Sequence, residues 1–194
     1  MGAEEDRISL QIIESLAKND RLPRKHADFW NFHSKPSKEL GIFSEIFDRF
    51  ESARSTKIVE WGLCEPDPPD VYVRFENGNC AGVEITELVN EPAIAAQIRK
   101  EASYSIESMK FDFDAACMKI AEIVREKAWK VAAVRRNYDE LCLLIHTDEP
   151  LLSSDQFGSV PKTITSNDRE AFDTVLLLFS YEPQKQKCPL ITLK

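Results

Sequence analysis

Two carboxylates stand close together in the stretch "PDPPDVYVRFENGNCAGVEITELVN", which covers residues 66–90. Residues 70–76 and 80–89 alternate apolar and polar types on either side of an Asn-Gly turn, a pattern typical of a β-hairpin. Asp70 begins the first predicted strand, and Glu84 stands among apolar residues of the second. Because an unpaired buried carboxylate is costly, the position of Glu84 indicates a site rather than a purely structural strand.

Carboxylates on adjacent strands form an oxygen-rich site, which suits a hard cation such as Mg²⁺ or Mn²⁺. Such an ion can polarise a phosphodiester and lower the pKa of a bound water. Side-chain alternation places Glu84 and Thr86 on one face of the sheet and Ile85 on the other. Glu84 and Thr86 would therefore both point into the site.

The predicted helix over residues 113–137 carries lysines on or beside its apolar face. Its apolar stripe consists of Ile120, Ile123, Val124, Val131 and Val134. Lys127 follows Ile120 by seven residues and Val124 by three, so helical periodicity points it toward the sheet. Lys130 borders the same face. Lys127 is therefore expected on the buried side of this helix.

The remaining pattern supplies the elements that must position these groups. Residues 44–55 predict a helix that Ser44 caps, and residues 57–65 predict a strand before the hairpin. The apolar run at 140–147 predicts a central strand, 172–182 a second buried strand, and 188–194 a short edge strand. An amphipathic helix is expected at 7–18, followed by a polar stretch that Pro23 and Pro36 interrupt. We expect one domain over 1–194, with a helical or irregular arm at about 1–41 and a core at about 42–182.

The motifs "PPD", ending in Asp70, and "EIT", beginning at Glu84, in the predicted order α-β-β-β-α-β resemble the PD-(D/E)XK (restriction-endonuclease-like) nuclease superfamily. In that family an acid begins the second core strand, a D/E-x-K triplet lies in the third, and the preceding helix often adds an acid. The resemblance covers roughly residues 42–147. It implies an α/β fold with a mixed β-sheet flanked by helices.

The resemblance further implies a divergent nuclease that uses Mg²⁺ or Mn²⁺ to hydrolyse phosphodiester bonds in DNA. It assigns the metal to Asp70, Glu84 and the Ile85 backbone carbonyl, with Glu45 as the acid of the first helix. Lys127 would replace the lysine that the family carries where this chain has Thr86. Further candidates for substrate contact or for the lysine's role are Thr86, Lys130, Gln97 and Lys100. A homodimer or a larger complex would improve the grip on DNA.

Other interpretations stay open at this stage. Asp70 could be an ordinary turn residue, Glu84 could face solvent, and Lys127 could lay its stem over the sheet edge. Glu45 could be a surface charge. Position 86 carries a threonine instead of the family's lysine, and the net charge is −8. Both observations favour an alternative function: a catalytically inactive nuclease-fold module for binding or assembly. A third interpretation is an unrelated α/β interaction protein.

Composition narrows the classes of function. The net charge of −8 argues against a protein that coats nucleic acid non-specifically, but not against a nuclease whose basic groups line one groove. The five cysteines include no CxxC pair, which favours reduced thiols in a cytoplasmic protein. No secretory signal or membrane-length apolar run is evident. His26 and His33 fit surface or packing positions, and His146 is a minor candidate at the end of a predicted strand.

Overall fold

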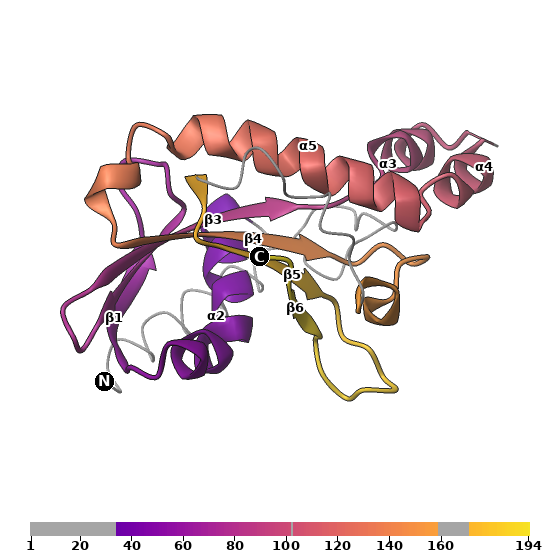
Figure 1. Ribbon diagram of the computed structural model, residues 1–194. Coiled ribbons are helices and arrows are strands. Elements are labelled where there is room, and N and C mark those ends of the chain that lie inside the picture. The colour runs from indigo at the N-terminus through magenta and orange to yellow at the C-terminus, as the bar shows by residue number, and fades with distance from the viewer. Residues whose placement is uncertain (1–33, 102, 159–170) are drawn as a thin grey trace.

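The computed structural model describes residues 34–101, 103–158 and 171–194. In this part of the chain a β-sheet lies between helices that cover its two faces (Figure 1). The predicted helix at 7–18, the polar stretch up to residue 33, and both His26 and His33 lie outside the described residues.

The sheet has six strands in sequential order. They are β1 (Ile58–Leu63), β2 (Val71–Phe75), β3 (Cys80–Glu87), β4 (Glu140–Thr147), β5 (Thr174–Phe179) and β6 (Leu190–Thr192). β1, β2 and β3 form an antiparallel meander, β3, β4 and β5 are parallel, and β6 returns antiparallel to β5. The predicted α/β class with a mixed sheet is confirmed.

Helices occupy both sides of this sheet. Helix α2 (Lys35–Arg54) covers one face, and α5 (Phe113–Val131) runs along the other (Figure 1). The connection from β3 to α5 contains the short helices α3 (Glu91–Ile98) and α4 (Tyr104–Met109). Two 3₁₀ turns, η1 (Arg135–Asn137) and η2 (Ser154–Phe157), precede and follow β4.

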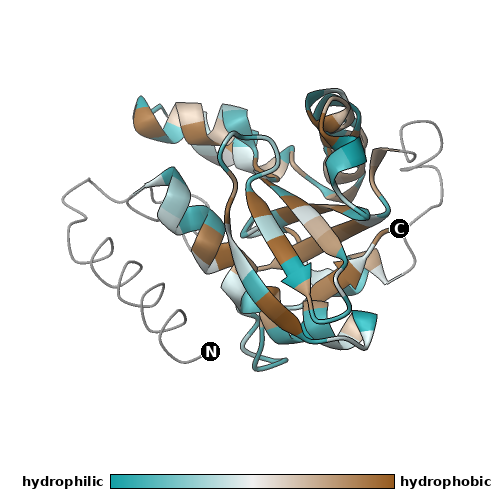
Figure 2. Ribbon diagram, turned by 90° about the vertical axis from the view of Figure 1, so that its left-hand side faces the viewer, coloured by the Kyte–Doolittle hydropathy of each residue, from teal (hydrophilic) through white to brown (hydrophobic). Residues whose placement is uncertain are grey.

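Side-chain alternation divides the core into two layers. Val83 and Ile85 of β3 pack in the cluster that contains the buried face of α2. Leu141 and Leu143 of β4 pack in the opposite cluster with the apolar stripe of α5. Hydrophobic residues accordingly gather along the strands between the helical layers (Figure 2). By the same alternation Glu84, between Val83 and Ile85, lies on the face of β3 that α5 covers.

Helix α2 begins nine residues before the predicted start at Ser44, so the expectation of an irregular arm is wrong for residues 35–41. Ser34 caps the helix, and its side chain accepts a hydrogen bond from the Ser37 N–H at 3.3 Å. Pro36 lies in the first turn, where the backbone N–H that proline lacks has no partner within the helix anyway. The proline therefore marks the start of the helix instead of breaking it.

Among the described residues, no helix has both the length and the apolar character that crossing a membrane would require.

Candidate metal centre

Three acids from two segments meet at one point of the sheet. Asp67 and Asp70 belong to the connection between β1 and β2, and Glu84 lies in β3; one carboxylate oxygen from each lies within 4.8 Å of the others. Prolines occupy positions 66, 68 and 69, and each fixes its own φ. The Cys64 N–H closes the connection by donating to the Asp70 carbonyl at 3.0 Å. The two aspartates therefore stand on a restrained segment.

Hairpin register brings Asp70 beside Glu84. Val71 pairs with Val83, and the Asp70 Oδ2 atom accepts a hydrogen bond from the Ile85 N–H at 2.7 Å. Asp70 is 3% exposed and Glu84 is 0% exposed. The solvent-facing interpretation of Glu84 is therefore wrong, and Asp70 is more than a turn residue because its side chain connects β2 to β3.

Helix α5 places two amines on Glu84. The Lys127 Nζ lies 2.7 Å and the Lys130 Nζ 2.9 Å from the same atom, Glu84 Oε1. Residues three apart share a helix face, which is why both lysines reach one carboxylate. The Lys130 Nζ also lies 2.9 Å from Asp67 Oδ1. The structure thus brings the predicted residues Asp70, Glu84 and Lys127 together, with Lys130 beside them.

The first turns of α2 add one cation and one acid. The Lys35 Nζ lies 2.8 Å from Asp67 Oδ2, and it lies 3.1 Å from both Asp70 Oδ1 and Glu39 Oε1. Glu39 is 7% exposed. We call Glu39, Asp67, Asp70 and Glu84 the acidic cluster. Three lysines, Lys35, Lys127 and Lys130, form ion pairs with it.

The environment of Glu39 favours its protonated form. Burial and the neighbouring charge of Asp70 raise the pKa of Glu39 to about 7, although Lys35 acts in the opposite direction. In contrast, hydrogen bonds from Lys35 and Lys130 hold the pKa of Asp67 below its usual range. With Glu39 protonated, the three remaining carboxylates balance the three amines. Ionisation of Glu39 leaves the metal-free cluster with one excess negative charge.

This arrangement predicts a pH dependence of stability in the presence of EDTA. Because the pKa of Glu39 is higher in the folded state than the ordinary value of 4.5, its protonation stabilises the fold fully below pH 4.5. That stabilisation is lost as the pH rises through about 7. Relative to Glu39→Gln, the wild-type protein should lose on the order of 2 kcal/mol across this window. Urea unfolding at several pH values measures it; a difference that stays constant with pH would contradict the prediction.

Two buried oxygens of the acidic cluster accept no hydrogen bond from the described residues, and one of them is paired with an exposed lysine. Among the residues that the structure describes, Glu84 Oε2 has no hydrogen-bond partner, and the contact of Asp70 Oδ1 is the ion pair with the Lys35 Nζ at 3.1 Å. In each carboxylate the other oxygen is engaged, Asp70 Oδ2 by the Ile85 N–H and Glu84 Oε1 by the two lysines. Oxygen atoms of this kind are the ligands that hard divalent cations prefer. The residues present therefore fit a divalent metal ion.

Other predicted site residues take different places. Glu45 is exposed, and its Oε1 pairs with Arg49 of the same helix at 3.6 Å. Six residues of helix rotate a side chain by about 240°, so Glu39 and Glu45 cannot share one face. Thr86 is half-buried two residues beyond Glu84. Ile85 contributes its N–H to Asp70, as described above.

Gln97 and Lys100 lie near the end of α3, apart from the residues that pair with the acidic cluster. Gln97 is half-buried, whereas Lys100 is exposed and adopts a φ of 56°. His146 is buried in β4, where it pairs in register with Glu87.

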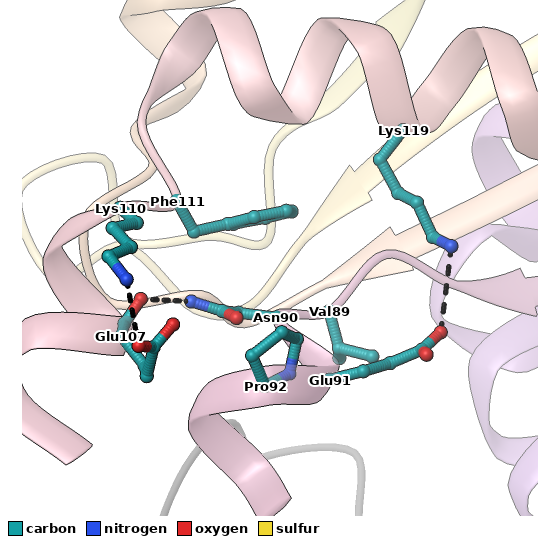
Figure 3. A pocket seen from close by; sticks show the side chains of 8 residues that line it. All are labelled: Val89, Asn90, Glu91, Pro92, Glu107, Lys110, Phe111 and Lys119. Atoms are coloured by element: carbon teal, nitrogen blue, oxygen red, sulfur yellow. Dashed lines mark hydrogen bonds and ion pairs between the residues drawn. The ribbon is translucent and has the colours of Figure 1, made fainter. Parts of the chain in front are cut away.

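A hollow of about 260 Å³ separates the start of α3 from α4 and α5. Figure 3 shows the Phe111 ring extending across it and a lysine on either side. The Lys110 Nζ lies 2.8 Å from Glu107 Oε1, and the Lys119 Nζ lies 3.6 Å from Glu91 Oε1. These lysines are thus paired locally, and the hollow is distinct from the acidic cluster.

Sequence reasoning missed Lys35, Glu39 and Asp67. The first two were assigned to an irregular arm because Pro36 was interpreted as a helix breaker. The signal that identifies them is Ser34 followed by Pro36, the combination typical of a helix start. Asp67 lies in the same proline-rich connection as Asp70, but no residue pattern indicates which way its side chain points.

Gly82 makes room for this arrangement, on the same face of β3 as Glu84. A Cβ at this position would lie 2.7 Å from Leu141 Cδ2 and 2.8 Å from Pro69 Cγ. Gly82→Ala should therefore lower the free energy of unfolding by about 1–3 kcal/mol. The matched control is Gly158→Ala, whose Cβ would meet Asp155 O at an ordinary 3.5 Å. Urea unfolding compares them; equal midpoints would refute the steric argument.

Comparisons of this chain with protein-family models, with curated proteins and with solved structures find no match.

Proposed function

We propose that this protein is a metal-dependent nuclease that hydrolyses phosphodiester bonds in DNA. One observation carries the proposal. The ligand oxygens of Asp67, Asp70 and Glu84 lie within 4.8 Å of one another, and two lysines from a separate helix contact Glu84. Acids for a divalent cation and amines for a phosphate thus occur at the same place.

The architecture supports the same proposal. Along the chain, α2, β1, β2, β3, α5 and β4 follow the order α-β-β-β-α-β of the PD-(D/E)XK superfamily. Asp70 immediately precedes β2, and Glu84 lies within β3, which are the positions of the two acids in that family. We therefore propose a restriction-endonuclease-like arrangement with Lys127 and Lys130 in the role of the family's lysine.

Asp70 and Glu84 would hold Mg²⁺ or Mn²⁺ through Asp70 Oδ1 and Glu84 Oε2, and the ion would take the place of the Lys35 amine at Asp70 Oδ1. The Ile85 carbonyl would add a backbone ligand, because the N–H and C=O of one strand residue point to the same neighbouring strand. Glu39 and Asp67 supply further carboxylates at the edge of the site. When bound, the ion supplies Lewis-acid polarisation of the phosphodiester and a lowered pKa for the attacking water.

The chain's own cations have a separate task. Lys127 and Lys130 place two positive charges where negative charge would accumulate on phosphate, and electrostatic stabilisation of this kind is often the largest single contribution to catalysis. Their side chains are 23% and 37% exposed. Both amines can therefore contact a bound substrate while they remain close to Glu84. Lys35, with a side chain 63% exposed, approaches the acids from α2 and can also stabilise negative charge on the phosphate.

One observation favours the alternative, a catalytically inactive module of the same fold. Every acid of the cluster forms an ion pair with a lysine, and Lys35 and Lys130 each contact more than one of them. Such a network could tie α2 and α5 to the sheet without any metal. The two functions differ in whether a divalent cation binds.

The test is a titration of Mg²⁺ and Mn²⁺ with plasmid DNA and single-stranded DNA as substrates. We expect cleavage that depends on either ion and stops on addition of EDTA. Calorimetry with Mn²⁺ alone should show binding to the metal-free protein. Absence of both cleavage and Mn²⁺ binding would refute the nuclease and favour the inactive module.

A further inference from the structure

A second cavity lies beside the chain segment that carries Asp67 of the acidic cluster. It has a volume of about 430 Å³ and is lined in part by Pro66 and Pro68, the two residues on either side of Asp67. The remaining wall includes two aromatic rings, Tyr72 of β2 and Tyr138 before β4. A group in this cavity would therefore lie one short segment of chain away from the acids.

Two glycines leave room for these rings. A Cβ at Gly62 would approach the Tyr72 ring to 3.2 Å, and one at Gly82 would approach Tyr138 Cδ1 to 3.3 Å. The hydroxyl groups are held as well, since the Tyr72 Oη donates to Glu60 at 3.0 Å and the Tyr138 Oη lies 3.5 Å from Cys64 Sγ. Both rings are half-buried, so each is fixed in place and partly accessible.

The cavity is chemically suited to a flat, neutral group. Among its lining residues Glu65 is the one that carries a formal charge at neutral pH, and it is exposed. Burial raises the pKa of the Tyr138 phenol, which keeps that group neutral. Among the described residues no lysine or arginine lines this wall, so it offers a phosphate no cation, whereas Lys130 pairs with Asp67 on the adjoining segment. The Asn137 side chain on the rim offers an amide that can both donate and accept hydrogen bonds.

We propose that this cavity binds one unpaired nucleobase of the DNA whose scissile phosphate would lie beside the acidic cluster, at the lysines that pair with it. Stacking on tyrosine accepts any base, because every base has a π-face. A base within a duplex has both faces covered by its neighbours, so the bound base must come from a single strand or be turned out of the helix. The inference rests on the proposed nuclease function and specifies its substrate as DNA with an unpaired nucleotide at the cleavage site.

The test uses single-stranded DNA that contains the fluorescent base 2-aminopurine, with Ca²⁺ in place of Mg²⁺ so that binding is measured without cleavage. Stacking quenches this fluorophore. We expect quenching by the wild-type protein and by Tyr138→Phe, which keeps the ring. Tyr138→Leu and Tyr72→Leu should each bind this strand at least about fivefold more weakly. Tyr181→Leu removes an exposed tyrosine outside the cavity wall and should behave like wild type.

A cleavage experiment locates the base relative to the cut. Substrates with one abasic position should show reduced cutting at a fixed offset from that position with the wild-type protein, and this gap should disappear with Tyr138→Leu. Equal quenching by all variants, or tighter binding of fully paired DNA, would overturn the inference and leave the nuclease proposal intact. Tyrosine-dependent quenching without any metal-dependent cleavage would overturn the nuclease proposal alone.

Discussion

Glu84→Gln should lower metal-dependent DNA cleavage by at least about 100-fold, since even residues that only support a metal ligand change affinity or activity by 10–100-fold. Glutamine preserves the shape of the side chain but removes the charge, and its amide nitrogen cannot serve as a ligand. Glu84 is 0% exposed and one of its oxygens lacks a hydrogen-bond partner among the described residues. The loss should therefore appear in metal affinity as well as in cleavage.

The variant should still fold. Lys127 and Lys130 are both partly exposed, so their amines can turn toward water when Glu84 loses its charge. We expect a loss of about 2 kcal/mol in the free energy of unfolding, the value of a hydrogen bond to a charged group. Cleavage by gel assay, Mn²⁺ affinity by calorimetry and unfolding by urea give the three readouts.

Glu87→Gln is the matched control because it removes the same charge from the same strand. Glu87 pairs with Lys38 of α2 at 2.8 Å instead of with the lysines of α5. We expect cleavage and Mn²⁺ affinity within about twofold of wild type, as for a partly exposed ion pair. A comparable loss of activity in both variants would show that Glu84 has no special role.

The double substitution Lys127→Met and Lys130→Met is expected to have the second large effect. Both amines contact Glu84 Oε1, so either lysine can partly replace the other. Each single variant should lose about threefold or less in cleavage, whereas the double variant should lose about 100- to 1000-fold, the range for removal of a group that stabilises transition-state charge. If the loss of cleavage in the double variant only equals the product of the two single losses, the two lysines do not replace each other.

Stability provides a second readout of this pair. Without both amines Glu84 becomes a buried charge without compensation, which costs about 3 kcal/mol. Mn²⁺ should restore much of that stability, because a bound cation stabilises the folded state and takes over the neutralisation of Glu84. Lys119→Met is the control, since Lys119 lies on the same helix but pairs with Glu91 and Glu122. Failure of Mn²⁺ to raise the stability of the double variant would argue against a metal site at Glu84.

Much of the fold follows from local patterns. The alternation around the Asn-Gly turn predicted β2 and β3, and the apolar run at 140–147 predicted β4, because these patterns reflect which face of each strand is buried. The spacing of the apolar stripe in α5 also predicted the side on which Lys127 lies, since a helix repeats every 3.6 residues. The predicted start of α2 was wrong, because proline is tolerated in the first turn of a helix but breaks its interior, and the sequence around Pro36 was interpreted in the second sense.

The sequence by itself determined that Asp70 stands where one strand begins, that Glu84 lies in the neighbouring strand and that Lys127 faces the sheet, because strand and helix periodicities are local. Only the tertiary structure decided that Lys35 and Glu39 from one face and Lys130 from the other converge on these acids. It also decided that Glu84 is buried and that Asp67 completes the cluster. These facts depend on how α2 and α5 pack across the sheet, and no periodicity within a single element encodes the distance between two elements.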